Sequence, residues 1–143
     1  MQILLLDNSK PDCAIFTPKL LESLRRHGSV TACKTRAETI RAIQPARNYD
    51  AIVFSGSSLN MSDSLRTAAI AKDLMVLLRY PDVPCLGVCF GMQLIAVAYG
   101  GEVERMAEAR VGELATTHND FGARASREDV AFFSHQDVVV TAP

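Results

Sequence analysis

The sequence predicts an α/β protein with an open, mostly parallel sheet, helices on both faces and short antiparallel β pieces near the C-terminus. Short apolar runs such as Ile3–Leu6 and Ala51–Phe54 end in polar loops, which is typical of strands buried on both faces. Segments with helical spacing of apolar residues alternate with these runs, and this order favours parallel strands joined by crossover helices. Ligands of such sheets bind at the carboxyl ends of the strands, so we expect a functional site in the loops that follow them.

The first half of the chain supplies three strands and two helices. Ile3–Leu6 is the expected central strand, and it stops at the polar residues Asp7-Asn8-Ser9. Thr17-Pro18 opens an amphipathic helix that ends at Gly28, because proline suits the first helical turn and glycine the residue after the last. The remaining elements expected in this half are a strand over Ser29–Cys33, a short helix over Ala37–Ile43 and a strand over Ala51–Phe54.

The second half begins with a predicted helix over Ser62–Leu78, which Tyr80-Pro81 follows. The apolar run Val83–Val88 is the expected fourth strand, and it leads directly into a helix that begins at Cys89 and ends at Gly100-Gly101. Beyond this helix the pattern changes to short β pieces separated by a polar loop around residues 118–127. These pieces are Glu102–Met106, Val111–Ala115, Val130–Phe133 and Val138–Thr141.

The composition, with 48% hydrophobic and 22% charged residues among 143, indicates a single domain over residues 1–143 that buries a sizeable core. The net charge of −1 leaves no basic surplus for phosphates, so we expect neither nucleic-acid nor membrane-surface binding. No apolar run approaches the roughly 18 residues of a membrane span, and the four cysteines lack the spacing of structural zinc sites. We expect a cytoplasmic protein with reduced thiols and with neither metal nor cofactor.

One cysteine lies in a pattern that favours nucleophilic chemistry. Gly87-Val88-Cys89-Phe90-Gly91 places a thiol between two glycines where a strand turns into a helix, the arrangement of a nucleophile elbow. The helix N-terminus favours the thiolate, and the Phe90 N–H is placed to stabilise an oxyanion. The alternative is a buried cysteine that opens a core helix. That ordinary role is expected for the remaining cysteines, which are Cys13, Cys33 and Cys85.

The elbow, extended by Met92-Gln93, resembles the nucleophile segment of the class I (triad-type) glutamine amidotransferases. Ile3–Asn8 is similar to the first strand of that family, Asp50–Gly56 to the strand that leads to its oxyanion loop, and Ser134–Val139 to its glutamine-contacting loop. Within the family, the amidotransferase domain of GMP synthetase and the γ-glutamyl peptidase-like members resemble this chain most. The resemblance implies a flavodoxin-like fold.

The resemblance also implies a reaction, which is hydrolysis of the glutamine side-chain amide through a thioester on Cys89. The ammonia would pass to a synthetase partner, and the substrate would be L-glutamine or a γ-glutamyl compound. The implied binding residues are Gly56 or Ser57 with Phe90 for the oxyanion, Gln93 from the helix, and Ser134, His135 and Gln136 around the glutamine.

Two departures from the family pattern bear on activity. Gly56 is followed by Ser57-Ser58 where the family usually has a further glycine. The family's base and orienting carboxylate lie in a later His-Pro-Glu segment, and no His-x-Glu occurs in these 143 residues. We therefore expect a C-terminally short domain with impaired turnover, whose exposed strand edges favour pairing as a homodimer.

Three histidines are candidates for the base. His27 is expected at the end of the first helix, His118 in the polar loop, and His135 in the binding segment. Three functions therefore stay open: an amidotransferase domain, a γ-glutamyl peptidase or hydrolase, and a non-catalytic remnant that binds glutamine or a partner.

Overall fold

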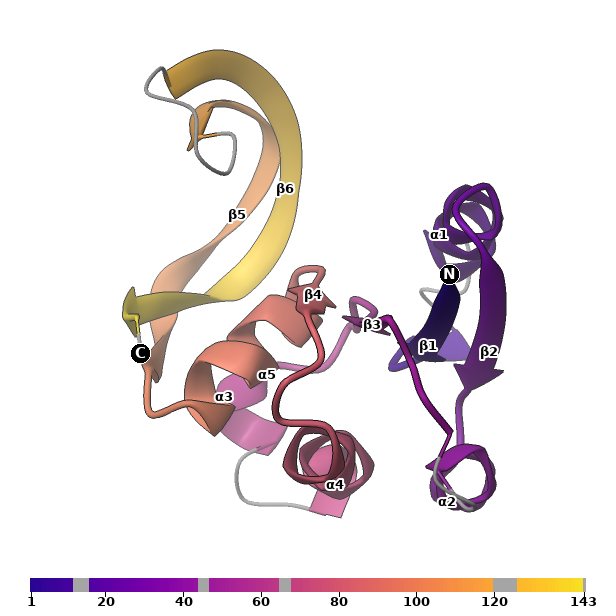
Figure 1. Cartoon of the computed structure of the whole chain (residues 1–143). Helices are drawn as coiled ribbons and strands as arrows, with labels where there is room; N and C mark the ends of the chain where they lie inside the picture. Colours follow the sequence, from indigo (N-terminus) through magenta and orange to yellow (C-terminus); the bar gives the residue numbers. More distant parts are fainter. Residues whose placement is uncertain (12–15, 44–46, 65–67, 120–125, 143) are drawn as a thin grey trace.

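A four-stranded parallel sheet forms the centre of the molecule (Figure 1). The computed structural model describes residues 1–11, 16–43, 47–64, 68–119 and 126–142. The strands lie in the order β2-β1-β3-β4, with bounds Gln2–Leu6 for β1, Ser29–Cys33 for β2, Ala51–Phe54 for β3 and Cys85–Gly87 for β4. All three strand pairs are parallel, which confirms the predicted sheet.

The apolar run of β1 explains its central position. Ile3–Leu6 pairs with β2 on one side and with β3 on the other, and these four side chains are almost completely buried. Alternate residues point to opposite faces of the sheet. Leu4 and Leu6 join the larger apolar core, whereas Ile3 and Leu5 join a smaller core on the other face. A strand without a solvent face needs apolar residues at every position, as this one has.

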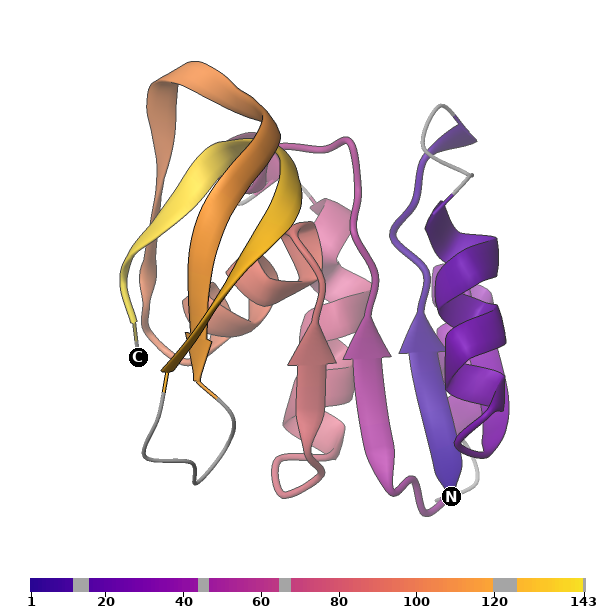
Figure 2. The same ribbon diagram turned by 90° about the horizontal axis from the view of Figure 1, so that it is seen from above.

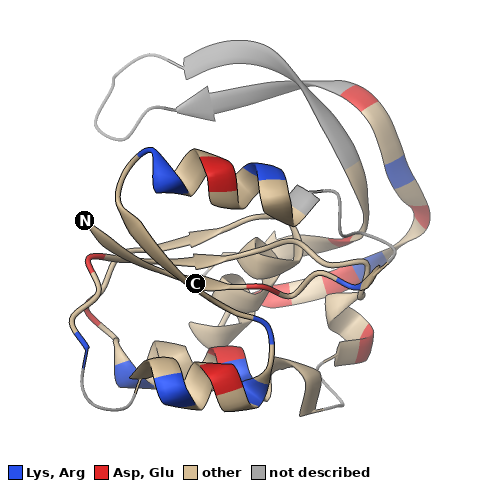
Figure 3. Cartoon of the chain, turned by 90° about the vertical axis from the view of Figure 1, so that its right-hand side faces the viewer, with Lys and Arg blue, Asp and Glu red and all other residues tan. Residues whose placement is uncertain are grey.

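Helices cover both faces, as predicted. Helix α1 (Phe16–Arg25) packs against the smaller core, and it lies on the opposite side of the sheet from α2 (Arg36–Ile43) and α4 (Ala71–Arg79) in Figure 1. The larger core receives side chains from α2, α4 and α5 (Phe90–Ala98). Figure 3 shows basic and acidic residues interspersed on the outer helices, in keeping with a net charge near zero. None of the helices in the described ranges has the length and apolar character needed to cross a membrane.

The predicted helix over Ser62–Leu78 is wrong in its extent. The structure instead has α3 (Met61–Ser64), a 3-10 turn at Ala68–Ile70 and then α4, and residues 65–67 lie outside the described ranges. Ser62 binds a distant residue, Asp137, through its N–H and its hydroxyl. This tertiary contact anchors α3 to β6, a feature that local periodicity does not show.

The C-terminal part forms a long antiparallel hairpin where the sequence predicts four short β pieces. Strand β5 spans Glu102–Asn119 and β6 spans Ser126–Thr141, and the two curl away beside the sheet (Figure 2). His118, expected in a polar loop, therefore lies in β5. The pieces join because β5 and β6 pair along most of their length, with register shifts near Glu102 and between Arg105 and Arg110.

Candidate functional site

The strand β4 leads into α5 through a sharp turn at Cys89. Cys89 has φ +51° and ψ −110° and occupies the N-cap position of α5. Among the described residues it is the only one other than glycine with a positive φ. Backbone strain of this kind persists only where the surroundings impose it, and it concentrates at functional positions.

Two glycines make room for this turn. A Cβ atom on Gly87 would lie 2.4 Å from the Met92 nitrogen, and one on Gly91 would lie 2.2 Å from the carbonyl oxygen of Phe54. Both distances are far below a normal contact, and both neighbours are main-chain atoms. The backbone of α5 therefore lies against β3 and β4 too closely for any side chain at these positions. The Cys89 side chain, in contrast, is exposed.

Main-chain amides of the first turn of α5 follow directly after Cys89. The N–H groups of Met92 and Gln93 donate to the Cys89 carbonyl oxygen at 3.0 and 3.1 Å. In the part of the chain that the structure describes, the Phe90 and Gly56 N–H groups have no backbone acceptor. Gly56 is close to the turn, since a Cβ atom there would lie 3.7 Å from the Cys89 Cβ. Two amides near the thiol are thus available to an anion, and the helix dipole adds to their effect.

The loops after β1 and β3 hold each other beside Cys89. The Ser55 hydroxyl accepts the Asn8 N–H at 2.8 Å and donates to the Gly56 carbonyl oxygen at 3.1 Å. Asp7 accepts hydrogen bonds from the Ser9 N–H at 2.9 Å and the Thr17 hydroxyl at 3.2 Å. Burial by itself would raise the pKa of Asp7, but these hydrogen bonds and the nearby Lys34 outweigh it and lower that pKa.

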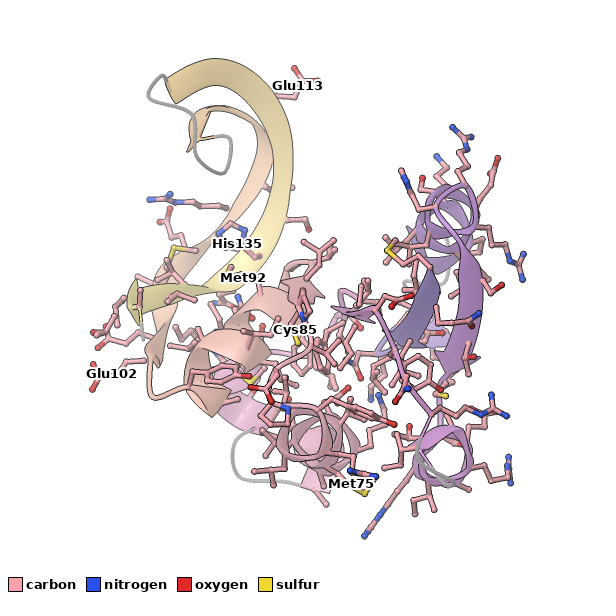
Figure 4. The ribbon with its side chains drawn as sticks, viewed as in Figure 1. Met75, Cys85, Met92, Glu102, Glu113 and His135 are labelled. Atoms are coloured by element: carbon pink, nitrogen blue, oxygen red, sulfur yellow. The ribbon has the colours of Figure 1, made fainter. Side chains whose placement is uncertain are left out.

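The strand β6 approaches the same place from the hairpin. The Gln93 side-chain nitrogen donates a 2.7 Å hydrogen bond to the Asp137 carbonyl oxygen, and both residues are buried. This contact ties β6 to α5 one helical turn after Cys89. Figure 4 shows His135 of β6 near Met92 of α5.

A cavity of about 970 Å³ lies between these elements. Its lining brings together almost all of the predicted site residues, namely Gly56, Ser57, Cys89, Gln93, Ser134, His135 and Gln136. The Phe90 side chain is buried in the core, which leaves its main-chain N–H as the group that can serve the site. Of the three histidines, His135 lines the cavity, and the exposed His27 follows α1 without lining it. The side chain of His118 lies outside the described part.

Asp137 is the site residue that the sequence interpretation left without a role. Its carboxylate accepts hydrogen bonds from the N–H and hydroxyl of Ser62, far away along the chain. An acid directly before the apolar residues Val138, Val139 and Val140 was the available signal, because a carboxylate that becomes buried in an apolar strand needs partners.

The other described cysteines differ from Cys89 in their surroundings. Cys33 is buried, and burial together with Glu38 raises the pKa of its thiol. Burial also raises the pKa of the half-buried Cys85. Cys13 lies outside the described ranges. Within those ranges no group of three or more His, Cys, Asp or Glu side chains could hold a metal ion.

Fold and site together define the class of protein. A parallel α/β sheet that presents an exposed cysteine on a left-handed turn, at a helix N-terminus and in a cavity, has the form of a nucleophile-elbow protein. Residues 11–143 match the family model described as "Glutamine amidotransferase class-I". The chain belongs to the class I glutamine amidotransferases.

Relatives within this family are named as GMP synthases. The chain is 30% identical over 145 residues to a subunit of the glutamine-hydrolyzing GMP synthase of Methanocaldococcus jannaschii, an alignment that covers 99% of this chain and 70% of that protein. It is 32% identical over 115 residues to the glutamine-hydrolyzing GMP synthase of Exiguobacterium sibiricum, covering 77% of this chain. The aligned part is only 20% of that larger protein.

A solved structure has a similar fold. A protein from Thermoplasma acidophilum, described as a GMP synthase subunit, superimposes with a TM-score of 0.76, over all of this chain and 68% of that one. The two sequences are 22% identical, so this likeness supports the fold alone.

Proposed function

We propose that this chain binds L-glutamine and hydrolyses its side-chain amide, with Cys89 as the nucleophile. The observation that carries the proposal is the exposed thiol of Cys89, held with a positive φ at the N-terminus of α5 inside a cavity it shares with Ser134, His135 and Gln136. A thiolate is favoured at such a position, and a strained turn keeps it clear of the core.

The proposed reaction is an acyl transfer to sulfur followed by hydrolysis. The Cys89 sulfur forms a bond to the side-chain carbonyl carbon, and the Phe90 N–H with an amide of Gly56 or Ser57 stabilises the oxyanion. The carbon–nitrogen bond then breaks, and the nitrogen takes up a proton and leaves as ammonia. Water attacks the γ-glutamyl thioester to release glutamate and restore the thiol.

The binding roles follow the family resemblance. Gln93 contacts the substrate from α5, while Ser134 and Gln136 hold its α-amino and α-carboxyl groups through backbone atoms. His135 belongs to the same binding segment. Because two relatives are named as GMP synthases, we propose that the ammonia passes to a synthetase subunit or domain.

Release of ammonia from L-glutamine tests the proposal. The full chain is compared with Cys89→Ser and with the matched control Cys85→Ser, whose thiol lies on β4, the strand that leads to Cys89. Ammonia release that is lost in the first variant and retained in the second supports the role of Cys89. Release that persists in Cys89→Ser refutes it, and binding of glutamine without release in the unmodified chain supports a non-catalytic binding protein instead.

The size of the cavity is compatible with one alternative substrate class. A volume of about 970 Å³ is typical of sites for ligands much larger than a single amino acid, so a γ-glutamyl peptide would also fit. That substrate would release a free amino acid or peptide in place of ammonia. Incubation with γ-glutamyl peptides, followed by amine analysis, separates the two activities.

A further inference from the structure

We propose that Asp137 is the positioning residue of the glutamine pocket, acting through the β6 segment Ser134–Gln136. This inference rests on the proposed function, because it concerns how that segment is held opposite Cys89. Asp137 follows directly after the three binding residues, so a group that fixes Asp137 also fixes the end of that segment.

The carboxylate of Asp137 is buried and held by several donors. The residue is 2% exposed. One oxygen accepts the Ser62 N–H at 2.7 Å, and the other accepts the Ser62 hydroxyl at 3.2 Å and lies 3.5 Å from the Arg105 Nε. Arg105 is itself held by Asp63 at 2.6 Å. Charge-assisted hydrogen bonds to a buried carboxylate are strong and directional, so these contacts fix Asp137 against α3.

The main chain of Asp137 is held from a second direction. Its carbonyl oxygen accepts the 2.7 Å hydrogen bond from the side chain of Gln93, which is 3% exposed. Gln93 lies four residues after Cys89 on α5, and residues at this spacing share one face of a helix. Asp137 is therefore attached both to α3 and to the helix that presents the thiol.

The hairpin alone does not impose this position, because its ladder is interrupted there. Asp137 pairs with Arg105, but the next pair along β6 is His135 with Arg110. Four residues of β5, 106–109, thus lie opposite the single residue Gln136. At such an irregularity the ladder is locally disrupted and residues are left unpaired. The side-chain and main-chain contacts of Asp137 fix β6 one residue away from Gln136.

Loss of the Asp137 charge should weaken ligand binding without changing the reactivity of the thiol. When Asp137 loses its charge, Ser134–Gln136 is expected to shift relative to Cys89, and glutamine-like ligands should bind more weakly. The thiol itself stays on α5, so its intrinsic reactivity toward a small reagent should not change. Losing the alignment of one or two hydrogen bonds between this segment and the ligand is expected to raise the half-saturating ligand concentration about tenfold to a hundredfold.

The experiment measures alkylation of Cys89 in the full chain. The probe is the diazoketone analogue of L-glutamine, whose rate of reaction is followed against its concentration, with iodoacetamide as the small reagent. The variants are Asp137→Asn and the milder Ser62→Ala, which removes one donor to Asp137. Asp82→Asn is the matched control, since it makes the same change at an exposed acid outside this network.

We expect the half-saturating concentration of the diazoketone to rise in Asp137→Asn and, to a smaller extent, in Ser62→Ala. The iodoacetamide rate of each variant, and both reaction rates of Asp82→Asn, should match those of the unmodified chain. If Asp137→Asn does not fold, Ser62→Ala decides the question. The inference is overturned if a folded variant keeps the half-saturating concentration of the unmodified chain, or if its rates with the diazoketone and with iodoacetamide fall equally. Either result leaves the proposed function standing. Failure of the unmodified chain to saturate contradicts the proposed function, and the inference with it.

Discussion

The side-chain amide of Gln93 donates a 2.7 Å hydrogen bond to the main-chain carbonyl oxygen of Asp137, 44 residues further along the chain. The contact joins α5, which carries the thiol turn at its N-terminus, to β6, which carries the binding segment. Two walls of the cavity are therefore joined by a buried polar contact.

Replacing this donor should destabilise the fold. In Gln93→Met the side chain keeps a similar size, but the buried Asp137 carbonyl oxygen loses its partner, which costs about 1–3 kcal/mol. Urea unfolding measures the free energy of unfolding. The same change at the exposed Gln2 is the control and should have little effect. Equal stabilities of the two variants would show that the contact contributes nothing.

Gly91, beside the turn at Cys89, and Gly56, in the loop after β3, should differ sharply in how well they tolerate an added methyl group. In Gly91→Ala the new Cβ would meet the Phe54 carbonyl oxygen at 2.2 Å, so the backbone must move. We expect a loss of stability of about 1–3 kcal/mol or more, as for other overpacked sites. In Gly56→Ala the nearest atoms lie at 3.6 and 3.7 Å, an ordinary contact distance. Thermal unfolding of both variants checks this, and a Gly91→Ala protein as stable as Gly56→Ala would contradict the geometry.

Of the three cysteines that the structure describes, Cys89 should react first with limiting iodoacetamide. It is exposed at a helix N-terminus, whereas burial raises the pKa of both Cys33 and Cys85 and keeps their thiols protonated. Peptide mass spectrometry identifies the labelled residue. Earlier labelling of Cys85 or Cys33 would show that the turn does not activate its thiol.

Asp7 should contribute a pH-dependent part of the stability. Its pKa is lowered in the folded state, so its ionised form stabilises the fold above the unfolded pKa, and this contribution is lost as the pH falls through the lowered pKa. Asp7→Asn should therefore cost more stability at pH 7 than below about pH 3. Urea unfolding at both pH values measures the difference. A cost that is the same at both would contradict the assigned partners, Ser9 and Lys34.

Much of the sheet was predictable because its signals are local. The apolar runs at Ile3–Leu6 and Ala51–Phe54 and the glycines around Cys89 each determine short-range structure, and the structure contains the elements in the expected order. The family itself was also recognisable from these segments, and the matching family model confirms it.

The rest depends on contacts that local patterns do not show. The helix expected over Ser62–Leu78 is broken into shorter elements, and Ser62 there binds Asp137, 75 residues away. The four expected β pieces join into two long strands because β5 and β6 pair with each other on both sides of the break in the ladder between Arg105 and Arg110. The place of Asp137 beside Gln93 follows only from this tertiary arrangement.

Protection of Cys89 by the proposed substrate tests the central claim most directly. The chain is treated with the diazoketone analogue of L-glutamine in the presence of increasing L-glutamine, and the modified residue is identified by mass spectrometry. We predict that Cys89 alone is modified, and that L-glutamine slows the modification in a saturable way while D-glutamine does not. Modification of another cysteine, or a rate that L-glutamine leaves unchanged, would contradict the claim that Cys89 lies in a glutamine site.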